Sequence, residues 1–444
     1  MSDLAQFIAA TATEFGIPGL AVGVFADGHE IFATHGVTGI DNPLPITPDT
    51  LFAAGSITKP VTATALMRLV AEGRIDLNAT VQQYVPEFTA STDITVGALL
   101  NHTSGLDWNL LVDTGEGDDA LAEFARRLSD LPPIGKPGER SSYSQAGFNL
   151  LGRVIETVTG QSFERAVHDL VLAPVGMDNS VFQLSDVMTR RFAIGHELGA
   201  DHEMSVVRPW KGNRANNPGG GLATTVADQL RWMRVHLGKS DVLPTDMLAR
   251  MQEPTVQLRA SSLGDAIGQC WFVRDIDGVR TIGHGGSGFG QFAELLLVPE
   301  RDFAVVVMAN AGPDGIACNQ RIVRWVLAHY LGIDDVDPAP LPFDAAAAAE
   351  LVGRYEIDAM TFDITATPSS LVLEVRIKPE LRAAAGQDLP PDHAPFDVGL
   401  LPGAGDEYIV TSGAFVGQRG YFSRDEDGGV IGVDLAGRLF TRIG

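Results

Sequence analysis

The chain has 444 residues, of which 45% are hydrophobic and 20% charged, a balance typical of a globular protein of two or three domains. Its net charge of −24 would repel a phosphate backbone, so we expect no nucleic-acid partner. Two cysteines, Cys270 and Cys318, are too few for a disulfide framework. The sequence contains no run of about 18 apolar residues, so we expect no membrane span. The N-terminus lacks the basic start and apolar core of a secretion signal. We therefore expect a cytoplasmic protein, whose oligomeric state the sequence leaves open.

The first part of the chain mixes helices and strands. After an N-terminal helix, residues 19–36 form two apolar runs around the turn Asp27-Gly28, which predicts a β-hairpin. The segment 58–72 carries an apolar stripe and is followed by Gly73, which predicts a helix with a glycine stop. Further helices are predicted at 146–158 and 226–237.

Residues 107–130 contain the acidic run GEGDD and indicate a mobile surface excursion. Later, FVRDIDGVRTIG, FAELLLVPERD and FAVVVMAN alternate as strands with tight turns, which predicts an antiparallel set. A helix is predicted at residues 316–331, after these strands. We therefore expect an α+β domain over residues 1–333, built on an antiparallel sheet flanked by helices.

The composition changes at residues 334–350, DDVDPAPLPFDAAAAAE. Its prolines predict a stiff linker and its alanines a short helix. Beyond it, residues 351–444 read as short strands separated by turns, which predicts an all-β domain, either a small barrel or a sandwich.

Ser56 and Lys59, in the stretch GSITKP, are the first candidates for chemistry. Their spacing places both side chains on one face of the helix that begins here, near its positive end. If that face is buried, the lysine loses solvation and can take the proton of the serine. The same residues also suit a helix cap followed by a solvated lysine, so the pair alone decides nothing.

Two other stretches supply groups that acyl transfer would need beside a nucleophile and a base. Tyr143 stands in SYSQAGFNLLG before a helix, and His284 stands in GHGGSGFG at a strand end. Each stretch also has an interpretation without catalysis. Tyr143 would be a half-buried aromatic residue with a satisfied hydroxyl, and GHGGSGFG would be a glycine-rich hairpin turn. The second stretch also fits G-x-G-x-x-G, but the following FAELLLV indicates a strand where a dinucleotide site needs a helix.

Together the three stretches resemble the serine β-lactamase and penicillin-binding-protein superfamily, most closely its class C β-lactamase and esterase branch, which is peptidase family S12-like. GSITK is similar to the family's Ser-x-x-Lys, Tyr143-Ser-Gln145 to its Tyr-x-Asn, and His284-Gly285-Gly286 to its Lys/His-Thr/Gly-Gly motif. Other segments, such as ALLNHTSGL and NPGGGLATT, are also similar to sequences of this branch. The resemblance covers residues 4 to 332 and implies a β-lactamase/transpeptidase-like fold with an all-helical subdomain. The C-terminal domain resembles the lipocalin-like barrel that some members carry.

The resemblance implies roles for the catalytic residues. Ser56 would attack a carbonyl, Lys59 and Tyr143 would form the proton network that activates it, and Tyr143 would protonate the leaving group. The backbone N–H groups of Ser56 and Ser287 would form the oxyanion hole. No cofactor or metal is implied.

Two positions differ from the β-lactamase pattern. His284 replaces the lysine of β-lactamases and would hydrogen-bond Tyr143. Gln145 stands where asparagine is usual, so it would either serve the substrate amide and the lysine differently or point away. Gln145 is expected on the substrate side of the site, together with Gly285 and Gly286.

The implied function is a serine hydrolase that acts through a covalent acyl-enzyme on an ester or amide, possibly a D-amino-acid amide or peptide. One alternative is an acyltransferase or peptide cyclase with an amine acceptor; another is a non-catalytic receptor of the penicillin-binding-protein type. The expected partner is a small-molecule or peptide substrate. His196-Glu197 and His202-Glu203 are too far apart for a known zinc pattern and indicate a polar loop.

Overall fold

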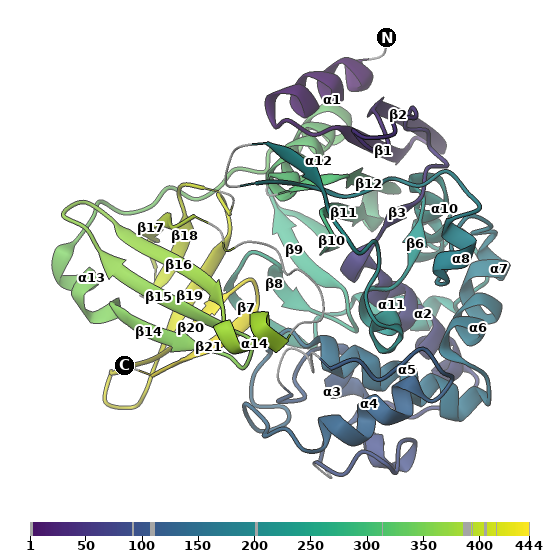
Figure 1. Ribbon diagram of the computed structural model, residues 1–444, viewed down its shortest axis with the longest axis horizontal. Helices are drawn as coiled ribbons and strands as arrows, with labels where there is room; N and C mark the ends of the chain where they lie inside the picture. The colour runs from purple at the N-terminus through teal and green to yellow at the C-terminus, as the bar shows by residue number, and fades with distance from the viewer. Residues whose placement is uncertain are drawn as a thin grey trace. The chain divides into compact units, whose positions relative to one another are not determined.

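The computed structural model describes residues 3–90, 93–106, 112–199, 203–312, 314–384, 392, 394–403, 406–413 and 415–443. The chain forms two compact units, Met1–Val256 with Ala266–Asp335, and Gln257–Asp265 with Val336–Gly444 (Figure 1). The first unit contains helices packed on a sheet, and the second contains a closed barrel. Among these described residues, no helix is long and apolar enough to cross a membrane.

The largest sheet has eight strands in the order β2-β1-β12-β11-β10-β9-β8-β7. Each strand from β2 to β8 in this order pairs antiparallel with the next, which confirms the predicted antiparallel sheet. The bounds are β1 (Gly19–Ala26), β2 (His29–Gly36), β7 (Val256–Ser261), β8 (Gly264–Ile267), β9 (Phe272–Ile276), β10 (Val279–Gly288), β11 (Gln291–Val298) and β12 (Phe303–Ala309).

Strands β1 and β12 are buried along their whole length because helices cover both faces of the sheet. Successive side chains of a strand point to opposite faces. Leu20 and Val22 therefore pack with α1 (Asp3–Glu14) and α12 (Gly315–Leu331), whereas Phe25 belongs to the core on the other face, which also contains residues of α10 (Val226–His236). The continuous apolar runs of β1 and β12 therefore contribute side chains to both hydrophobic cores, one on each face of the sheet.

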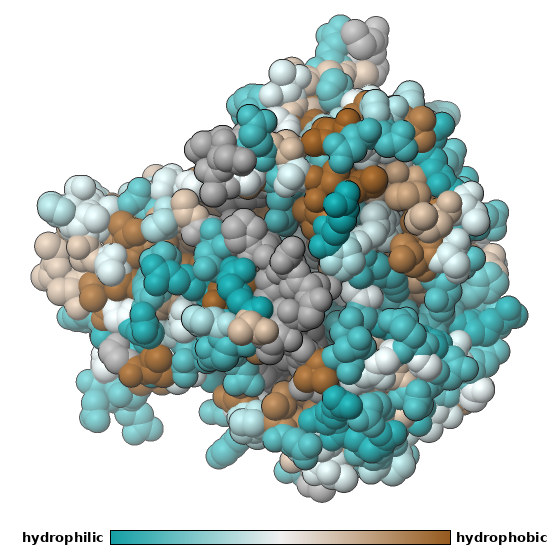
Figure 2. All heavy atoms as spheres, in the orientation of Figure 1, coloured by the Kyte–Doolittle hydropathy of each residue, from teal (hydrophilic) through white to brown (hydrophobic). Residues whose placement is uncertain are grey.

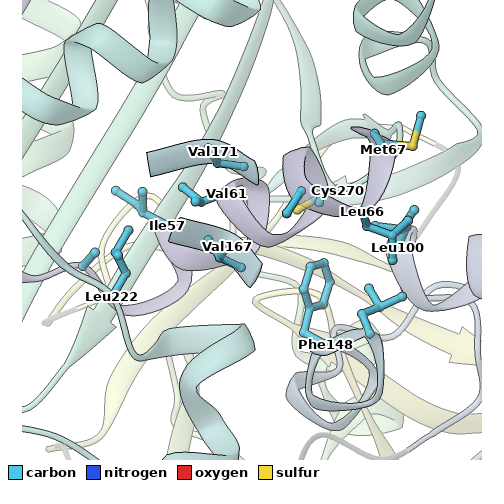
Figure 3. Packing of buried hydrophobic residues seen from close by; sticks show 14 of the residues in the cluster. Ile57, Val61, Leu66, Met67, Leu100, Phe148, Val167, Val171, Leu222 and Cys270 are labelled. Carbon is cyan, nitrogen blue, oxygen red and sulfur yellow. The ribbon is translucent and has the colours of Figure 1, made fainter. Parts of the chain in front are cut away.

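Helix α2 (Thr58–Ala71) runs through the larger core and is buried on nearly all sides, not only along the predicted stripe. Figure 3 shows Val61 and Leu66 of this helix among apolar side chains from other elements. Its polar residues are buried with partners: Thr62 Oγ1 donates to Pro218 O at 2.7 Å. A buried hydroxyl needs such a partner to avoid a desolvation cost. The polar side of α2 can therefore be buried because neighbouring elements supply hydrogen-bond acceptors.

The other helices of this unit are α3 (Val96–Leu100), α4 (Ala120–Leu128), α5 (Gln145–Thr159), α6 (Phe163–Val167), α7 (Ala173–Val175), α8 (Leu184–Val187), α9 (Asn217–Gly220) and α11 (Thr245–Gln252). Two small sheets join distant segments: β3 (Phe52–Ala53) with β6 (Ala223–Thr224), and β13 (Ala311–Gly312) with β4 (His196–Leu198) and β5 (Met204–Val206). Cys270 and Cys318 are buried and form no disulfide.

The prediction of a mobile excursion at 107–130 is wrong for its second half. Residues 120–128 form α4, whose Leu121, Phe124 and Leu128 are buried in the core. The acidic run GEGDD before it is exposed, and the surface around α4 to α6 is mostly hydrophilic in Figure 2. The sequence ALAEFARRL, which directly follows the acidic run, has the apolar spacing of an amphipathic helix. Residues 107–111 lie outside the described part.

The second unit contains a closed barrel of eight strands, which confirms the predicted barrel. Its buried aromatic residues include Tyr355, Phe362, Phe422 and Phe440, so side chains fill its interior. The strands are β14 (Gly353–Glu356), β15 (Met360–Ala366), β16 (Leu371–Ile377), β17 (Phe396–Leu400), β18 (Glu407–Val410), β19 (Arg419–Arg424), β20 (Val430–Leu435) and β21 (Arg438–Arg442), with helices α13 (Ala345–Leu351) and α14 (Pro379–Ala384).

Candidate active site

Ser56 lies in a short 3-10 turn, Gly55–Ile57, directly before α2, and it is partly exposed. Gly55 has a φ of +53°, a left-handed conformation that glycine adopts without strain. Strand β10 passes so close that a Cβ on Gly55 would lie 2.6 Å from the nitrogen of Ser287, and one on Gly286 would lie 3.1 Å from the nitrogen of Ser56. The two glycines therefore bring the backbone of Ser56 and Ser287, the expected oxyanion donors, side by side.

Lys59 is fully buried one helical turn after Ser56. Its Nζ donates to Ser56 Oγ at 3.1 Å, to Gln145 Oε1 at 2.6 Å and to Gly219 O at 2.8 Å. The ring of Tyr143 lies 4.9 Å from Nζ. The two carbonyl oxygens hold two N–H groups of the amine and leave its third position for Ser56 Oγ. A neutral amine held in this way turns its lone pair toward the serine hydroxyl and can accept its proton.

Tyr143 is buried in the loop before α5, and His102 holds this loop from both sides. Ser142 N donates to His102 O at 2.8 Å, and Ser144 N donates to His102 Nδ1 at 3.1 Å. The centroids of the His102 and Tyr143 rings lie 4.4 Å apart, with the ring planes tilted by 36°. His102 itself has a φ of +60°, which is uncommon for a residue with a side chain. The sequence offered only the similarity of ALLNHTSGL as a signal for this residue.

Ser144 completes the local frame, because its side chain caps α5 by accepting a hydrogen bond from Gly147 N at 3.1 Å. A serine at this position satisfies one of the free N–H groups at the start of a helix. Tyr143 therefore stands directly before a capped helix, between backbone atoms that His102 and the helix cap hold in place.

His284 is buried on β10, and its Nδ1–H donates to Gly285 O at 2.7 Å. Burial, with a smaller contribution from the charge of Lys59, lowers the pKa of His284 to about 3, so the ring is neutral at neutral pH. Its Nε2 has no hydrogen-bond partner among the described residues, and the ring centroid is 6.2 Å from that of Tyr143. The expected hydrogen bond to Tyr143 is therefore not formed, because Nδ1 donates to Gly285 O and the acceptor Nε2 has no partner among the described residues.

Gln145 begins α5 and accepts the hydrogen bond of Lys59 with its Oε1. Its Nε2 donates to Asn149 Oδ1 at 3.1 Å and, over 3.5 Å, to Asn216 O. The glutamine thus contacts Lys59 and does not point away from it, although its side chain is one methylene longer than that of asparagine. Neither Asn149 nor Asn216 was expected from the sequence.

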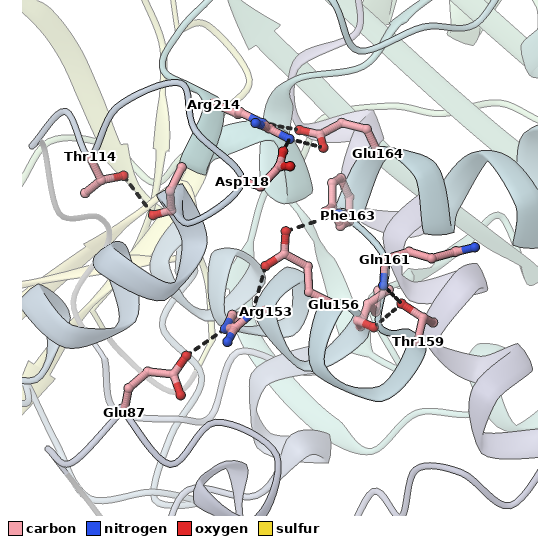
Figure 4. A network of polar contacts seen from close by, with 12 residues as sticks. Glu87, Thr114, Asp118, Arg153, Glu156, Thr159, Gln161, Phe163, Glu164 and Arg214 are labelled. Carbon is pink, nitrogen blue, oxygen red and sulfur yellow. Dashed lines mark hydrogen bonds and ion pairs between the residues drawn. The ribbon is translucent and has the colours of Figure 1, made fainter.

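Arg214, Glu164 and Asp118 form a charged network (Figure 4), and Asn217 of α9 lies beside it. Arg214 bonds Glu164 at 3.1 Å and Asp118 of the acidic segment at 2.8 Å, and Asn217 Nδ2 donates to Glu164 Oε1 at 2.6 Å. Burial alone would raise the pKa of Glu164, but the hydrogen bonds from Arg214 and Asn217 hold it below the usual value. Lys211 contacts Asn217 Oδ1, and burial lowers its pKa to about 8. This network supports α9, which carries the Gly219 carbonyl.

The histidine at position 196 is structural. Its Nδ1 bonds Asn310 O at 2.7 Å, and its Nε2 accepts from Ile40 N at 3.2 Å, so both ring nitrogens are occupied. His202 lies outside the described residues. Within the described residues, no group of three or more histidine, cysteine, aspartate or glutamate side chains is placed to hold a metal ion.

Several known proteins are similar to this chain over most of its length. In sequence, the chain is 34% identical over 369 residues to penicillin-binding protein 4 of Amycolatopsis lactamdurans, which spans 78% of this chain and 95% of that protein. It is 27% identical over 314 residues to protein Flp of Staphylococcus aureus (strain MW2), which spans 66% of this chain and only 60% of Flp.

Solved structures show the same fold. The crystal structure of SurE matches with a TM-score of 0.76 at 23% identity, covering 99% of this chain and 98% of SurE. A class C β-lactamase from Rhodobacter sphaeroides matches with a TM-score of 0.63 at 23% identity, covering 74% of this chain and all of that one. The β-lactamase family model matches residues 4–329. The chain therefore belongs to the β-lactamase family.

Proposed function

We propose that this protein is a serine hydrolase that forms a covalent acyl-enzyme at Ser56 and acts on an ester or amide. The observation that carries the proposal is the position of Lys59, whose Nζ lies 3.1 Å from Ser56 Oγ while two carbonyl oxygens hold its other N–H groups. A buried amine held beside a serine hydroxyl is the arrangement that makes serine a nucleophile.

The reaction would begin with a proton transfer from Ser56 Oγ to the neutral Nζ of Lys59. The oxygen then bonds to the substrate carbonyl carbon, and the carbonyl oxygen becomes an oxyanion. The backbone N–H groups of Ser56 and Ser287 would stabilise this charge, at about 3 kcal/mol per donor. Tyr143 would pass a proton to the leaving atom as the ester or amide bond breaks, and the proton that Lys59 took from Ser56 would replace it. Water would then attack the acyl-enzyme and release the acid.

The neutral ring of His284 supports one substrate class over another. A neutral imidazole does not attract a carboxylate as a lysine in the same place would, so a substrate without a carboxylate at this point suits the site best. This favours simple esters and amino-acid amides over β-lactam antibiotics, which carry a carboxylate beside the ring. A structure of SurE with D-Leu is among the similar folds, so esters and amides of D-amino acids belong in the first substrate panel.

The test is the intact mass of the protein after treatment with a fluorophosphonate and with a p-nitrophenyl ester. One adduct on the wild type and none on Ser56→Ala would support the proposal. Ser205→Ala, which changes an exposed serine of β5, is the matched control and should be labelled like the wild type. A folded wild type that forms no adduct would refute the proposal and favour a binding protein without catalysis. Products formed with and without an added amine would then separate hydrolysis from acyl transfer.

A further inference from the structure

The carboxamide of Gln145 is fully engaged within the protein. Its Oε1 accepts from Lys59 Nζ at 2.6 Å, and its Nε2 donates to Asn149 Oδ1 at 3.1 Å and to Asn216 O at 3.5 Å. Asn149 Nδ2 then donates to Asn216 Oδ1 at 2.9 Å. We call Gln145, Asn149 and Asn216 the carboxamide chain.

Lys59 determines the orientation of every amide in this chain. An N–H group of Lys59 Nζ points at this amide, and only the carbonyl oxygen of a carboxamide can accept it. The NH₂ end of Gln145 must then face Asn149 Oδ1, and Asn149 in turn presents its NH₂ to Asn216. Asn149 is fully buried and lies one helical turn after Gln145 on α5, on the same face. A reversed amide would leave a buried donor without an acceptor, so the chain holds Gln145 in one position.

Gly219 supplies the space for the longer side chain. A Cβ at this position would overlap Cδ and Nε2 of Gln145 and lie 2.5 Å from Oε1. Gly219 lies outside the left-handed region of φ, so the missing side chain, rather than the backbone conformation, is what the site needs. Its carbonyl also accepts from Lys59 at 2.8 Å, and an alanine would keep this carbonyl.

We propose that Gly219 and Asn149 make Gln145 a positioning residue for Lys59 instead of a substrate-binding residue. Both hydrogens of the NH₂ group are directed to protein oxygens, so none is left for a carbonyl oxygen of the substrate. The inference rests on the proposed acyl transfer at Ser56. A positioning role lowers kcat equally for all substrates, whereas a substrate-binding role raises KM for substrates that carry an amide.

The test compares Gly219→Ala, Gln145→Asn and the double variant on two substrates, p-nitrophenyl acetate and the p-nitrophenyl ester of an N-acetyl amino acid. Gly219→Ala should lower kcat by about 100-fold on both esters, since it displaces Gln145 from Lys59. The double variant should have the kcat of Gln145→Asn alone, because the shorter asparagine does not overlap the new Cβ at position 219. The effects of the two substitutions on kcat would then be non-additive. Gly220→Ala is the matched control and should keep wild-type rates, because the nearest atom to its Cβ is 4.0 Å away.

Additive effects, an unchanged kcat in Gly219→Ala, or a loss confined to KM of the N-acetyl ester would overturn the inference. If Gly219→Ala does not fold, recovery of a cooperative melting transition in the double variant tests the overlap. Asn149→Leu then tests the chain: a loss in kcat at constant KM supports it, and wild-type kinetics refute it. Failure of the fluorophosphonate to label wild-type Ser56 would instead remove the proposed function itself.

Discussion

The imidazole of His102 lies against the phenol ring of Tyr143, with centroids 4.4 Å apart and planes tilted by 36°. The same histidine bonds the backbone on both sides of Tyr143, through its carbonyl oxygen to Ser142 N and through Nδ1 to Ser144 N. A residue 41 positions earlier in the chain therefore holds the backbone on both sides of Tyr143 and contacts its ring.

Replacing His102 should lower turnover without weakening substrate binding. Asparagine tolerates a left-handed φ and places an acceptor oxygen where Nδ1 lies, so His102→Asn should stay within about fivefold of wild-type kcat. His102→Leu keeps neither property and should lose about 100-fold in kcat at unchanged KM. Ester hydrolysis measured across a concentration series distinguishes the two. Equal losses in both variants would mean that the hydrogen bond to Ser144 is not what matters.

Lys59 should act through proton transfer and not through its charge alone. Lys59→Arg places a guanidinium there that stays protonated at working pH and cannot accept a proton, and Lys59→Met removes the amine. Both should lower the rate of acylation by about 10²- to 10⁴-fold, measured as the initial burst of p-nitrophenol. An arginine variant with near wild-type acylation would contradict the role of Lys59 as the base.

Two glycines on one strand provide a paired test of the approach of β10 to the Ser56 turn. A Cβ on Gly286 would overlap Ala54 O and crowd Ser56 N, whereas a Cβ on Gly288, two residues further along, meets no atom within 4 Å. Gly286→Ala should therefore reduce acylation by about 100-fold, and Gly288→Ala should leave it unchanged. Fluorophosphonate labelling rates measure both, with melting curves to confirm that each variant folds. Similar rates in the two variants would argue against this close approach.

The barrel contains a carboxyl whose titration should be visible in stability. Burial raises the pKa of Asp434 to about 7 from an ordinary value of 3.8. Because the folded-state pKa is the higher one, its stabilising contribution is complete below pH 3.8 and is lost as the pH rises to about 7. The free energy of unfolding should fall by at most about 1.4 kcal/mol per pH unit in this window.

Asp434→Asn removes this titration but keeps an oxygen that can accept from Gly437 N, as Asp434 Oδ1 does at 3.3 Å. Its unfolding free energy, measured by urea titration, should therefore decline less than that of the wild type between pH 4 and 8 and exceed it at pH 8. Parallel pH curves for the two proteins would show that Asp434 is ionised in the folded barrel.

The local features of this protein were predictable because short-range spacing determines them. The i, i+3 relation puts Ser56 and Lys59 on one helical face, and apolar period and caps predicted helices near the observed bounds of α2, α5 and α10. The prediction failed where a local signal was misleading. The acidic run before α4 predicted a mobile loop where an amphipathic helix follows. The apolar stripe of α2 predicted burial of one face only, whereas its polar side is buried as well.

The sequence by itself determined the placing of Ser56 and Lys59 on one helical face, the antiparallel sheet and an all-β C-terminal domain, because these depend on periodicity, turns and the spacing of a few residues. Only the tertiary structure decided what the lysine bonds. Gln145 Oε1 and Gly219 O reach Lys59 from 86 and 160 residues away, and Asn149 and His102 then hold the groups that surround it. Such contacts follow from the packing of several helices at once, and no spacing along the chain encodes which amide turns toward which neighbour.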